Sequence, residues 1–174
     1  MIARPDPTLC DPTLCAISGC PGASPLRKTY NAFLCHTSVD KGAIVRRFHA
    51  LCKAKGLSTW FDEEEIAWGD RILDKISHGL AKSQFVVVFV SKASLTKDWV
   101  REELNTVLTL GVVKGSFVLP VLLGYSIESL KETHPVLASR RCLTVPLYDP
   151  AIGVTGTELA CLVKELETVV AQSR

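Results

Sequence analysis

The sequence predicts an α/β fold in three layers, with helices on both sides of a five-stranded parallel sheet, and two observations support this prediction. Short apolar runs rich in β-branched and aromatic residues recur along residues 29–174. Between these runs lie segments whose apolar residues repeat at helical spacing. Because strands and helices alternate, right-handed crossover connections follow, and a flavodoxin-like strand order of 2-1-3-4-5 is the simplest closure.

The expected strands are nearly continuous apolar runs, as is typical of strands buried on both faces of a parallel sheet. They are Thr29–Cys35, Leu57–Phe61, Gln84–Ser91, Ser116–Leu123 and Cys142–Leu147. The run Phe85–Val90, FVVVFV, falls far short of the roughly 18 apolar residues that a membrane-spanning helix needs. We therefore expect a soluble protein with no membrane partner.

The expected helices follow from apolar residues three and four positions apart, which form one buried stripe on each helix. The four stripes are Ile44, Phe48, Leu51 and Cys52; Ile72, Ile76 and Leu80; Val100, Leu104, Val107 and Leu108; and Leu159, Leu162, Val163 and Leu166. The connection near Ser126–Leu130 has a weaker pattern, which indicates a short helix or a loop.

Residues 1–28 differ in composition from residues 29–174, which we expect to form one domain of ordinary size. They hold five of the nine prolines and a tandem repeat of DPTLC, at Asp6–Cys10 and Asp11–Cys15. This composition predicts a flexible leader.

The cysteines and the charge balance argue against several kinds of site. Cys10, Cys15 and Cys20 are evenly spaced, but the spacing matches no common zinc pattern and no histidine lies nearby, so no metal is expected. A net charge of +2 predicts no broad surface for nucleic acid. The chain begins without the basic flank and apolar run of a secretory signal, so we expect a cytoplasmic protein with reduced cysteines.

Ligands of such sheets bind beyond the carboxyl ends of the strands, which points to the loops after the first three strands. His36, Thr37 and Ser38 follow the first strand and offer donors and acceptors near the start of a helix, where they could hold a phosphate or a ribose hydroxyl. The alternative is a helix cap formed by Ser38 or Asp40. The sequence leaves both interpretations open.

The loop after the second strand, Asp62–Arg71, is acidic and contains Trp68. A tryptophan in a loop can stack on a flat ligand or dock a partner, whereas the alternative is that Trp68 folds back on the edge of the sheet. Asp70 is expected to cap the following helix.

The stretch after the third strand places Trp99 and two acids at the start of a helix. At about 100° per residue, the apolar stripe of this helix is centred near Leu104. Glu102 then points away from the stripe and is expected to be a solvated charge. Glu103 lies on the same flank as Trp99, four residues earlier, so it can enter a cleft shared with the tryptophan or serve a structural role at the helix edge.

Several segments, in order along residues 29–174, resemble the signature segments of TIR (Toll/interleukin-1 receptor) domains, especially those of bacteria. They are YNAFLCHTSVDK, GLSTWFDEEEIAWGDRI, ISHGLAKSQFVVVFVSKASLTKDWVREEL and FVLPVLL. Each string is weak by itself, but the shared order is specific to this family.

Enzymatic TIR domains cleave NAD+ between nicotinamide and ribose, using a glutamate four residues after a tryptophan. The resemblance therefore implies that Glu103 is catalytic, that NAD+ is the substrate and that no cofactor is needed. It implies a substrate site formed by Phe33, His36, Thr37, Ser38, Asp62, Trp68, Gly69, Asp70, Arg71, Ser83 and Trp99. It also implies that the loop from Asp62 to Asp70 gates the site and mediates assembly. Two departures are Cys35, where many bacterial relatives have serine, and Trp68, where a smaller residue is common.

One carboxylate suffices for this reaction because nicotinamide leaves from a pyridinium and departs neutral, so the general acid of a glycosidase is unnecessary. The remaining task is to hold the ribose and to stabilise positive charge at its anomeric carbon. Capture by water yields ADP-ribose, whereas attack by the adenine or by a ribose hydroxyl yields a cyclic isomer. The sequence leaves both outcomes open.

The resemblance further implies immune (anti-phage) or cell-death signalling, activation by self-assembly into oligomers or filaments, and a separate sensor or effector protein as a possible partner. The alternative is a non-catalytic TIR scaffold that acts only through TIR–TIR contacts. Two other proteins of this fold class are not expected. Ser91 stands where a receiver domain needs an aspartate, and the segment HTS is a poor version of the phosphate loop of a flavodoxin.

Overall fold

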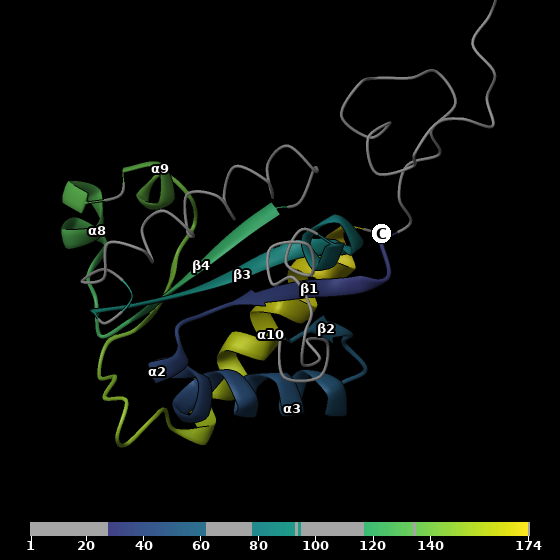
Figure 1. Ribbon diagram of the computed structural model, residues 1–174, viewed down its shortest axis with the longest axis horizontal. Helices are drawn as coiled ribbons and strands as arrows, with labels where there is room; N and C mark the ends of the chain where they lie inside the picture. Colours follow the sequence, from purple (N-terminus) through teal and green to yellow (C-terminus); the bar gives the residue numbers. More distant parts are fainter. Residues whose placement is uncertain (1–27, 62–77, 93, 95–116, 134, 174) are drawn as a thin grey trace, which may run out of the picture.

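A parallel sheet is the framework of the computed structural model, which describes residues 28–61, 78–92, 94, 117–133 and 135–173. Its five strands run in the order β2-β1-β3-β4-β5 (Figure 1). The strands are β1 (Tyr30–Cys35), β2 (Thr59–Trp60), β3 (Ser83–Ser91), β4 (Phe117–Leu123) and β5 (Leu143–Val145). The predicted fold class and strand order are therefore confirmed.

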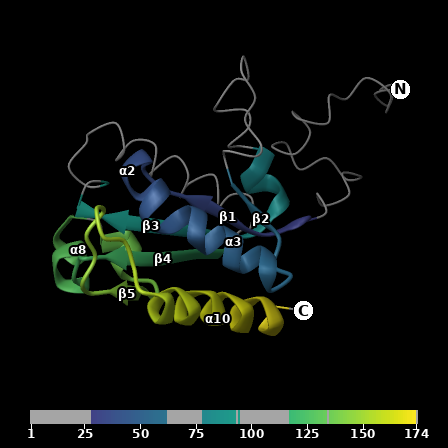
Figure 2. The ribbon, with the colours of Figure 1, turned by 90° about the horizontal axis from the view of Figure 1, so that it is seen from below.

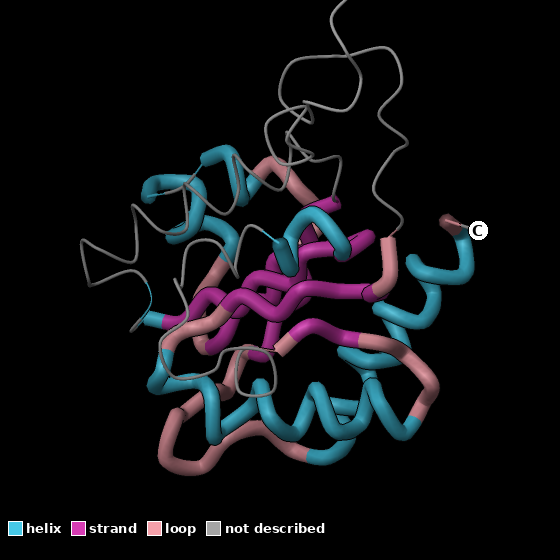
Figure 3. Tube along the Cα trace, turned by 45° about the vertical axis from the view of Figure 1, so that its right-hand side comes forward, coloured by secondary structure: helices cyan, strands magenta, loops and turns pink. Residues whose placement is uncertain are grey.

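Helices cover both faces of this sheet. On one face α3 (Arg46–Ala54) and α10 (Gly156–Gln172) lie side by side (Figure 2). On the other face lie α8 (Ile127–Thr133), α9 (Pro135–Ala138) and the helical residues 78–82, so that the sheet is the middle of three layers (Figure 3). The weak pattern near Ser126–Leu130 thus corresponds to a short helix, α8.

The hydrophobic core is divided into two clusters by the sheet, because successive residues of a strand point to opposite faces. In β3, one set of side chains joins the cluster under α3 and α10, and the alternate set joins the cluster under α8 and α9. The first set is Phe85, Val87 and Phe89, and the second is Val86, Val88 and Val90. Burial on both faces explains why this strand is a continuous apolar run.

Some expectations lie outside the described residues. These are the leader, except Lys28, and the helical stripes that contain Ile72, Ile76 and Val100–Leu108. Among the helices that the structure describes, none combines the length and the apolar character that crossing a membrane requires.

Candidate functional site

The loop after β1 begins the candidate site at the carboxyl edge of the sheet. It leads through α2 (Ser38–Asp40) and a π-helical turn, η2 (Lys41–Val45), into α3. Thr37 occupies the position before the first helical residue, with an extended backbone, and no side chain caps the helix there. The alternative in which Ser38 or Asp40 caps this helix is wrong, because both residues lie within α2 and the Asp40 side chain makes no cap hydrogen bond to η2 either. Asp40 instead turns into the protein and is 0% exposed.

Asp40 accepts hydrogen bonds from three hydroxyl groups that come from three separate parts of the chain. Thr37 Oγ1 donates to Asp40 Oδ2 at 2.6 Å, and Ser91 Oγ donates to the same oxygen at 2.7 Å. Tyr148 OH donates to Asp40 Oδ1 at 2.7 Å. A carboxylate so deeply buried needs such donors, since an unpaired charge in the interior is very costly.

The buried position of Asp40 has a signal in the sequence that the cap interpretation overlooked. Asp40 precedes Ile44 by four residues and Phe48 by eight, so it lies on the same helical face as the apolar stripe of α3. Ile44 is 0% and Phe48 1% exposed. An acid on the core-facing stripe of a helix indicates a buried carboxylate with partners elsewhere in the chain.

Hydrogen bonds with Ser94 fix Ser91 at the end of β3. The Ser91 backbone N–H donates to Ser94 Oγ at 2.9 Å, and Ser94 Oγ donates back to the Ser91 carbonyl at 2.7 Å. Both serines are buried. The Ser91 hydroxyl is thereby held at the end of β3, facing Asp40.

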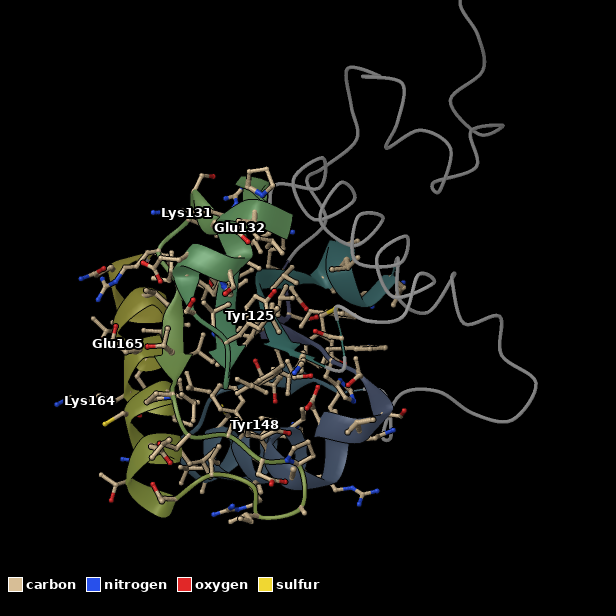
Figure 4. The ribbon with its side chains drawn as sticks, turned by 90° about the vertical axis from the view of Figure 1, so that its left-hand side faces the viewer. Tyr125, Lys131, Glu132, Tyr148, Lys164 and Glu165 are labelled. Atoms are coloured by element: carbon tan, nitrogen blue, oxygen red, sulfur yellow. The ribbon has the colours of Figure 1, made fainter. Side chains whose placement is uncertain are left out.

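Tyr148 reaches Asp40 from the loop that joins β5 to α10. In Figure 4, Tyr148 projects from this loop near the start of α3, whereas Tyr125 lies closer to α8. Burial, followed by the hydrogen bond to Asp40 and the negative charges of Asp40 and Asp149, raises the pKa of Tyr148 well above its usual value. The tyrosine is therefore held as a neutral hydrogen-bond donor.

The loop after β5 is attached to the start of α3 at further points. Arg47 Nη1 donates to the Val154 carbonyl at 2.6 Å. Gly153 has a φ of +80°, and a Cβ at that position would lie 2.8 Å from the Ala43 carbonyl oxygen, so a side chain is excluded. These contacts hold the loop across the same edge of the sheet that carries Asp40.

Aromatic and basic side chains line the ends of β1 and β2. The His36 and Phe61 rings are tilted, with centroids 5.5 Å apart, and Lys41 Nζ lies 5.6 Å from the Phe61 centroid. His36 is half-buried, and its Nδ1 lies 3.3 Å from the Leu34 carbonyl oxygen. Ser38 is exposed at the first turn of the following helix. Phe61 is itself only 3% exposed, so this edge offers a ligand the Lys41 ammonium and the polar groups of His36 and Ser38, backed by a buried ring.

Two other predicted residues lie apart from this edge. Phe33 is in the middle of β1, where it is 3% exposed and stacks on Trp60 with ring centroids 4.7 Å apart. Ser83 begins β3 at the amino edge of the sheet; it is 0% exposed and donates to the Gly79 carbonyl at 2.7 Å. The structure thus brings together His36, Thr37 and Ser38, and it separates them from Ser83.

The remaining predicted site residues lie outside the described residues. They are Asp62, Trp68, Gly69, Asp70, Arg71, Trp99 and Glu103. Within the part of the chain that the structure describes, no group of three or more histidine, cysteine, aspartate or glutamate side chains is arranged to hold a metal ion.

An open hollow of about 410 Å³ lies at the carboxyl ends of β4 and β5, on the other side of β3 from the loop after β1. Its lining is Gly124, Tyr125, Ser126, Ile127, Glu128, Thr144 and Pro146. Polar and concave features therefore continue along this edge of the sheet.

Comparisons with known proteins agree with this architecture. The family model of the TIR domain matches residues 32–149. The NAD(+) hydrolase TcpA of Theionarchaea archaeon (strain DG-70-1) is 34% identical over 111 residues, which are 64% of this chain and 34% of that protein. The 2' cyclic ADP-D-ribose synthase BtTIR of Bacteroides thetaiotaomicron is 28% identical over 121 residues, which are 70% of this chain and 42% of that protein. This chain thus spans less than half the length of these relatives.

Solved structures show the same fold. The TIR domain of the Toll-related receptor TRR-2 from Hydra magnipapillata superposes with a TM-score of 0.58 at 14% identity, covering 80% of this chain and 99% of that one. A metazoan TIR-STING receptor from C. gigas superposes with a TM-score of 0.60 at 18% identity, covering 79% of this chain and 40% of that one.

Proposed function

Because this chain belongs to the TIR domain family, we propose that it cleaves NAD+ at the bond between nicotinamide and ribose. The main support is the similarity, over 111 and 121 residues respectively, to relatives named as an NAD(+) hydrolase and a 2' cyclic ADP-D-ribose synthase. In the hydrolytic form of the reaction, NAD+ and water yield nicotinamide, ADP-ribose and a proton.

Glu103 is the catalytic carboxylate in this proposal, and Trp99 forms a wall of the site. The support is the tryptophan-to-glutamate spacing together with the helical geometry that separates Glu103 from Glu102. The carboxylate stabilises the positive charge that develops on the ribose as neutral nicotinamide departs. The reaction needs no general acid for the leaving group.

The described edge of the sheet supplies the rest of the site. The His36 ring lies against the Phe61 ring, Ser38 is exposed, and Thr37, between them in the chain, is hydrogen-bonded to Asp40. In the proposal these residues hold the polar parts of the dinucleotide, and the loop 62–71 is the further substrate-binding segment that the family resemblance implies. Phe33 and Ser83 are left out of the proposed site, because both are buried and Ser83 lies at the amino edge of the sheet. No cofactor takes part.

The product is set by which nucleophile captures the ribosyl cation. Water gives ADP-ribose, and a hydroxyl of the second ribose or the adenine gives a cyclic isomer. Both kinds of product occur in the names of the relatives. We propose that the protein makes one or both of these products.

The decisive experiment measures nicotinamide release and product identity by chromatography after incubation with NAD+. We expect Glu103→Ala to abolish release, because the cation then lacks its stabilising charge. Glu102→Ala is the matched control, since it removes a neighbouring acid that helical spacing predicts to be a solvated charge. Equal loss in both variants would contradict the assignment of Glu103.

We further propose that self-association through TIR–TIR contacts, in oligomers or filaments, activates the enzyme. In this proposal the protein acts in the cytoplasm during immune (antiviral) or cell-death signalling, together with a separate sensor or effector protein. Exposed apolar side chains support an interaction surface: Leu147 is 87% and Ile152 84% exposed, both on the attached loop after β5. Nicotinamide release should therefore rise more than proportionally with protein concentration.

The second candidate function is a non-catalytic TIR scaffold, which the same exposed residues favour. A scaffold releases no nicotinamide at any protein concentration, even with a crowding agent that promotes assembly. Nicotinamide release is compared between dilute and crowded samples, and the Glu103→Ala variant gives the background value. Release above that background supports the enzyme, and release equal to it supports the scaffold.

A further inference from the structure

We propose that Asp40 is a positioning residue that holds the loop 36–38 against the end of β3, so that this edge of the sheet can orient NAD+. The inference rests on the proposed function and deepens it. Asp40 is 0% exposed, so it does not meet a ligand itself. It acts through Thr37 and Ser91, whose hydroxyls it binds.

The need for such a residue follows from where strand pairing stops. β1 and β3 pair in parallel up to Cys35 opposite Val88. β3 continues for three more residues to Ser91, beside a loop that has already left the sheet. Beyond Cys35 the backbone ladder therefore no longer sets the distance between the loop and β3, and side chains must do so.

One atom of Asp40, Oδ2, links the loop after β1 to the end of β3. Its Oδ2 accepts the Thr37 hydroxyl at 2.6 Å and the Ser91 hydroxyl at 2.7 Å, so the two segments converge on one oxygen. Ser91 is itself held by its hydrogen bonds with Ser94. These hydrogen bonds thereby fix the position of Thr37, and of its neighbours His36 and Ser38, relative to the end of β3.

Tyr148 fixes the orientation of the carboxylate. It binds the other oxygen, Oδ1, from a loop that Gly153 and Arg47 attach to the start of α3. With both oxygens engaged, the carboxylate cannot rotate without breaking a hydrogen bond. Misplacement of a substrate-holding group by about 1 Å can reduce the rate of an enzyme by roughly 100-fold, so this restraint bears directly on catalysis.

The first test compares two identical substitutions. Thr37→Val removes the hydroxyl that binds Asp40 and keeps the branched shape of the side chain. Thr59→Val is the matched control, because Thr59 is equally buried and forms a 2.6 Å hydrogen bond with His49 Nδ1. We expect Thr37→Val to lower kcat/KM for nicotinamide release by roughly 10- to 100-fold, and Thr59→Val to leave it unchanged. Equal kcat/KM in the two variants would overturn the proposal.

Ser91→Ala tests whether the effect passes through Asp40. If Thr37 acted by touching NAD+ directly, Ser91→Ala would have no effect on turnover. We expect Ser91→Ala to reproduce the loss seen in Thr37→Val. Asp40→Asn should keep most of the activity, because its carbonyl oxygen can accept both hydroxyls while its amide donates to the Tyr148 oxygen. Full activity in Ser91→Ala would overturn the proposal.

Hydrogen exchange of residues 36–40 supplies a readout that does not depend on activity. Exchange should be faster in Thr37→Val and Ser91→Ala than in Thr59→Val, with all proteins folded by circular dichroism. If the folded unsubstituted protein releases no nicotinamide but these differences are present, the proposed function fails and Asp40 still orders the loop. Identical exchange in all three variants overturns the positioning role.

Discussion

Two polar clusters lie near the two ends of β1, and they differ in burial. At the carboxyl edge, Asp40 and its three hydroxyl donors lie in the interior or at its margin. At the amino end of β1, Asn31 and Ser58 exchange hydrogen bonds at the surface, including a 2.8 Å bond from the Ser58 N–H to Asn31 Oδ1. Water can replace the partners of the exposed cluster but not those of Asp40.

The difference in burial indicates at which edge of the sheet the loss of a hydrogen bond costs more stability. An exposed hydrogen bond contributes little, since both groups are solvated when it breaks. A buried carboxylate that loses a donor keeps the whole desolvation cost. The carboxyl edge should therefore be far more sensitive to substitution than the amino edge, and the following predictions test this contrast.

Asp40→Ala should have the largest effect. It leaves buried hydroxyl groups without their acceptor and a gap beside the start of α3, so we expect the free energy of unfolding to fall by about 3–5 kcal/mol. Urea denaturation followed by circular dichroism measures the change. A loss no greater than that of Asn31→Ala would remove the distinction between the two clusters.

Tyr148→Phe should have a smaller effect, about 1–2 kcal/mol, because it removes one donor and keeps the ring. The same denaturation measurement applies. Leu147→Ala, on the adjacent exposed residue, serves as the control and should leave the midpoint unchanged. If both substitutions gave the same loss, the hydroxyl of Tyr148 would have no special role.

The ionisation of Tyr148 should have a still smaller effect, which appears in the pH dependence of the unfolding free energy. In the unfolded chain its phenol loses a proton near the ordinary pKa of about 10, whereas in the folded protein the pKa is raised by burial and by Asp40. Stability from this group is thus fully present below pH 10 and is lost as the pH rises above it. The decline in unfolding free energy above about pH 10 should be weaker in Tyr148→Phe than in the unsubstituted protein. Parallel declines would contradict this origin.

Asn31→Ala should have the smallest effect, within about 0.5 kcal/mol, as is usual for surface substitutions. Thermal unfolding of this variant beside Ser58→Ala measures both members of the exposed cluster. A cost comparable to that of Tyr148→Phe would mean that the amino edge is as constrained as the carboxyl edge.

The strands could be predicted because burial on both faces leaves a continuous apolar run, as in β3, whereas their order was predicted from right-handed crossovers and the simplest closure of the sheet. The edge strand β2 is shorter than predicted, two residues within Leu57–Phe61, since it pairs with β1 alone. Cys161 lies within the apolar segment of α10 but is exposed, because it precedes Leu162 by one residue and so lies off the buried stripe of that helix.

The site residues remain predictions, and the structure shows only which of the described ones lie together. The rule that ligands bind at the carboxyl ends of strands led to His36, Thr37 and Ser38. The partners of Asp40 could not be predicted, because Ser91 and Tyr148 are 51 and 108 residues away and no local pattern relates them. The assignment of Glu103 remains a prediction from the sequence, since that residue lies outside the described residues.

The attachment of the loop after β5 bears on the order in which parts of the chain can assemble. Tyr148 meets Asp40, and Arg47 meets Val154, across separations of 108 and 107 residues, so closing these contacts costs more chain entropy than closing local ones. A chain that has been made only through β4 already contains Ser91, which binds Asp40 Oδ2, but it lacks Tyr148, the donor to Oδ1.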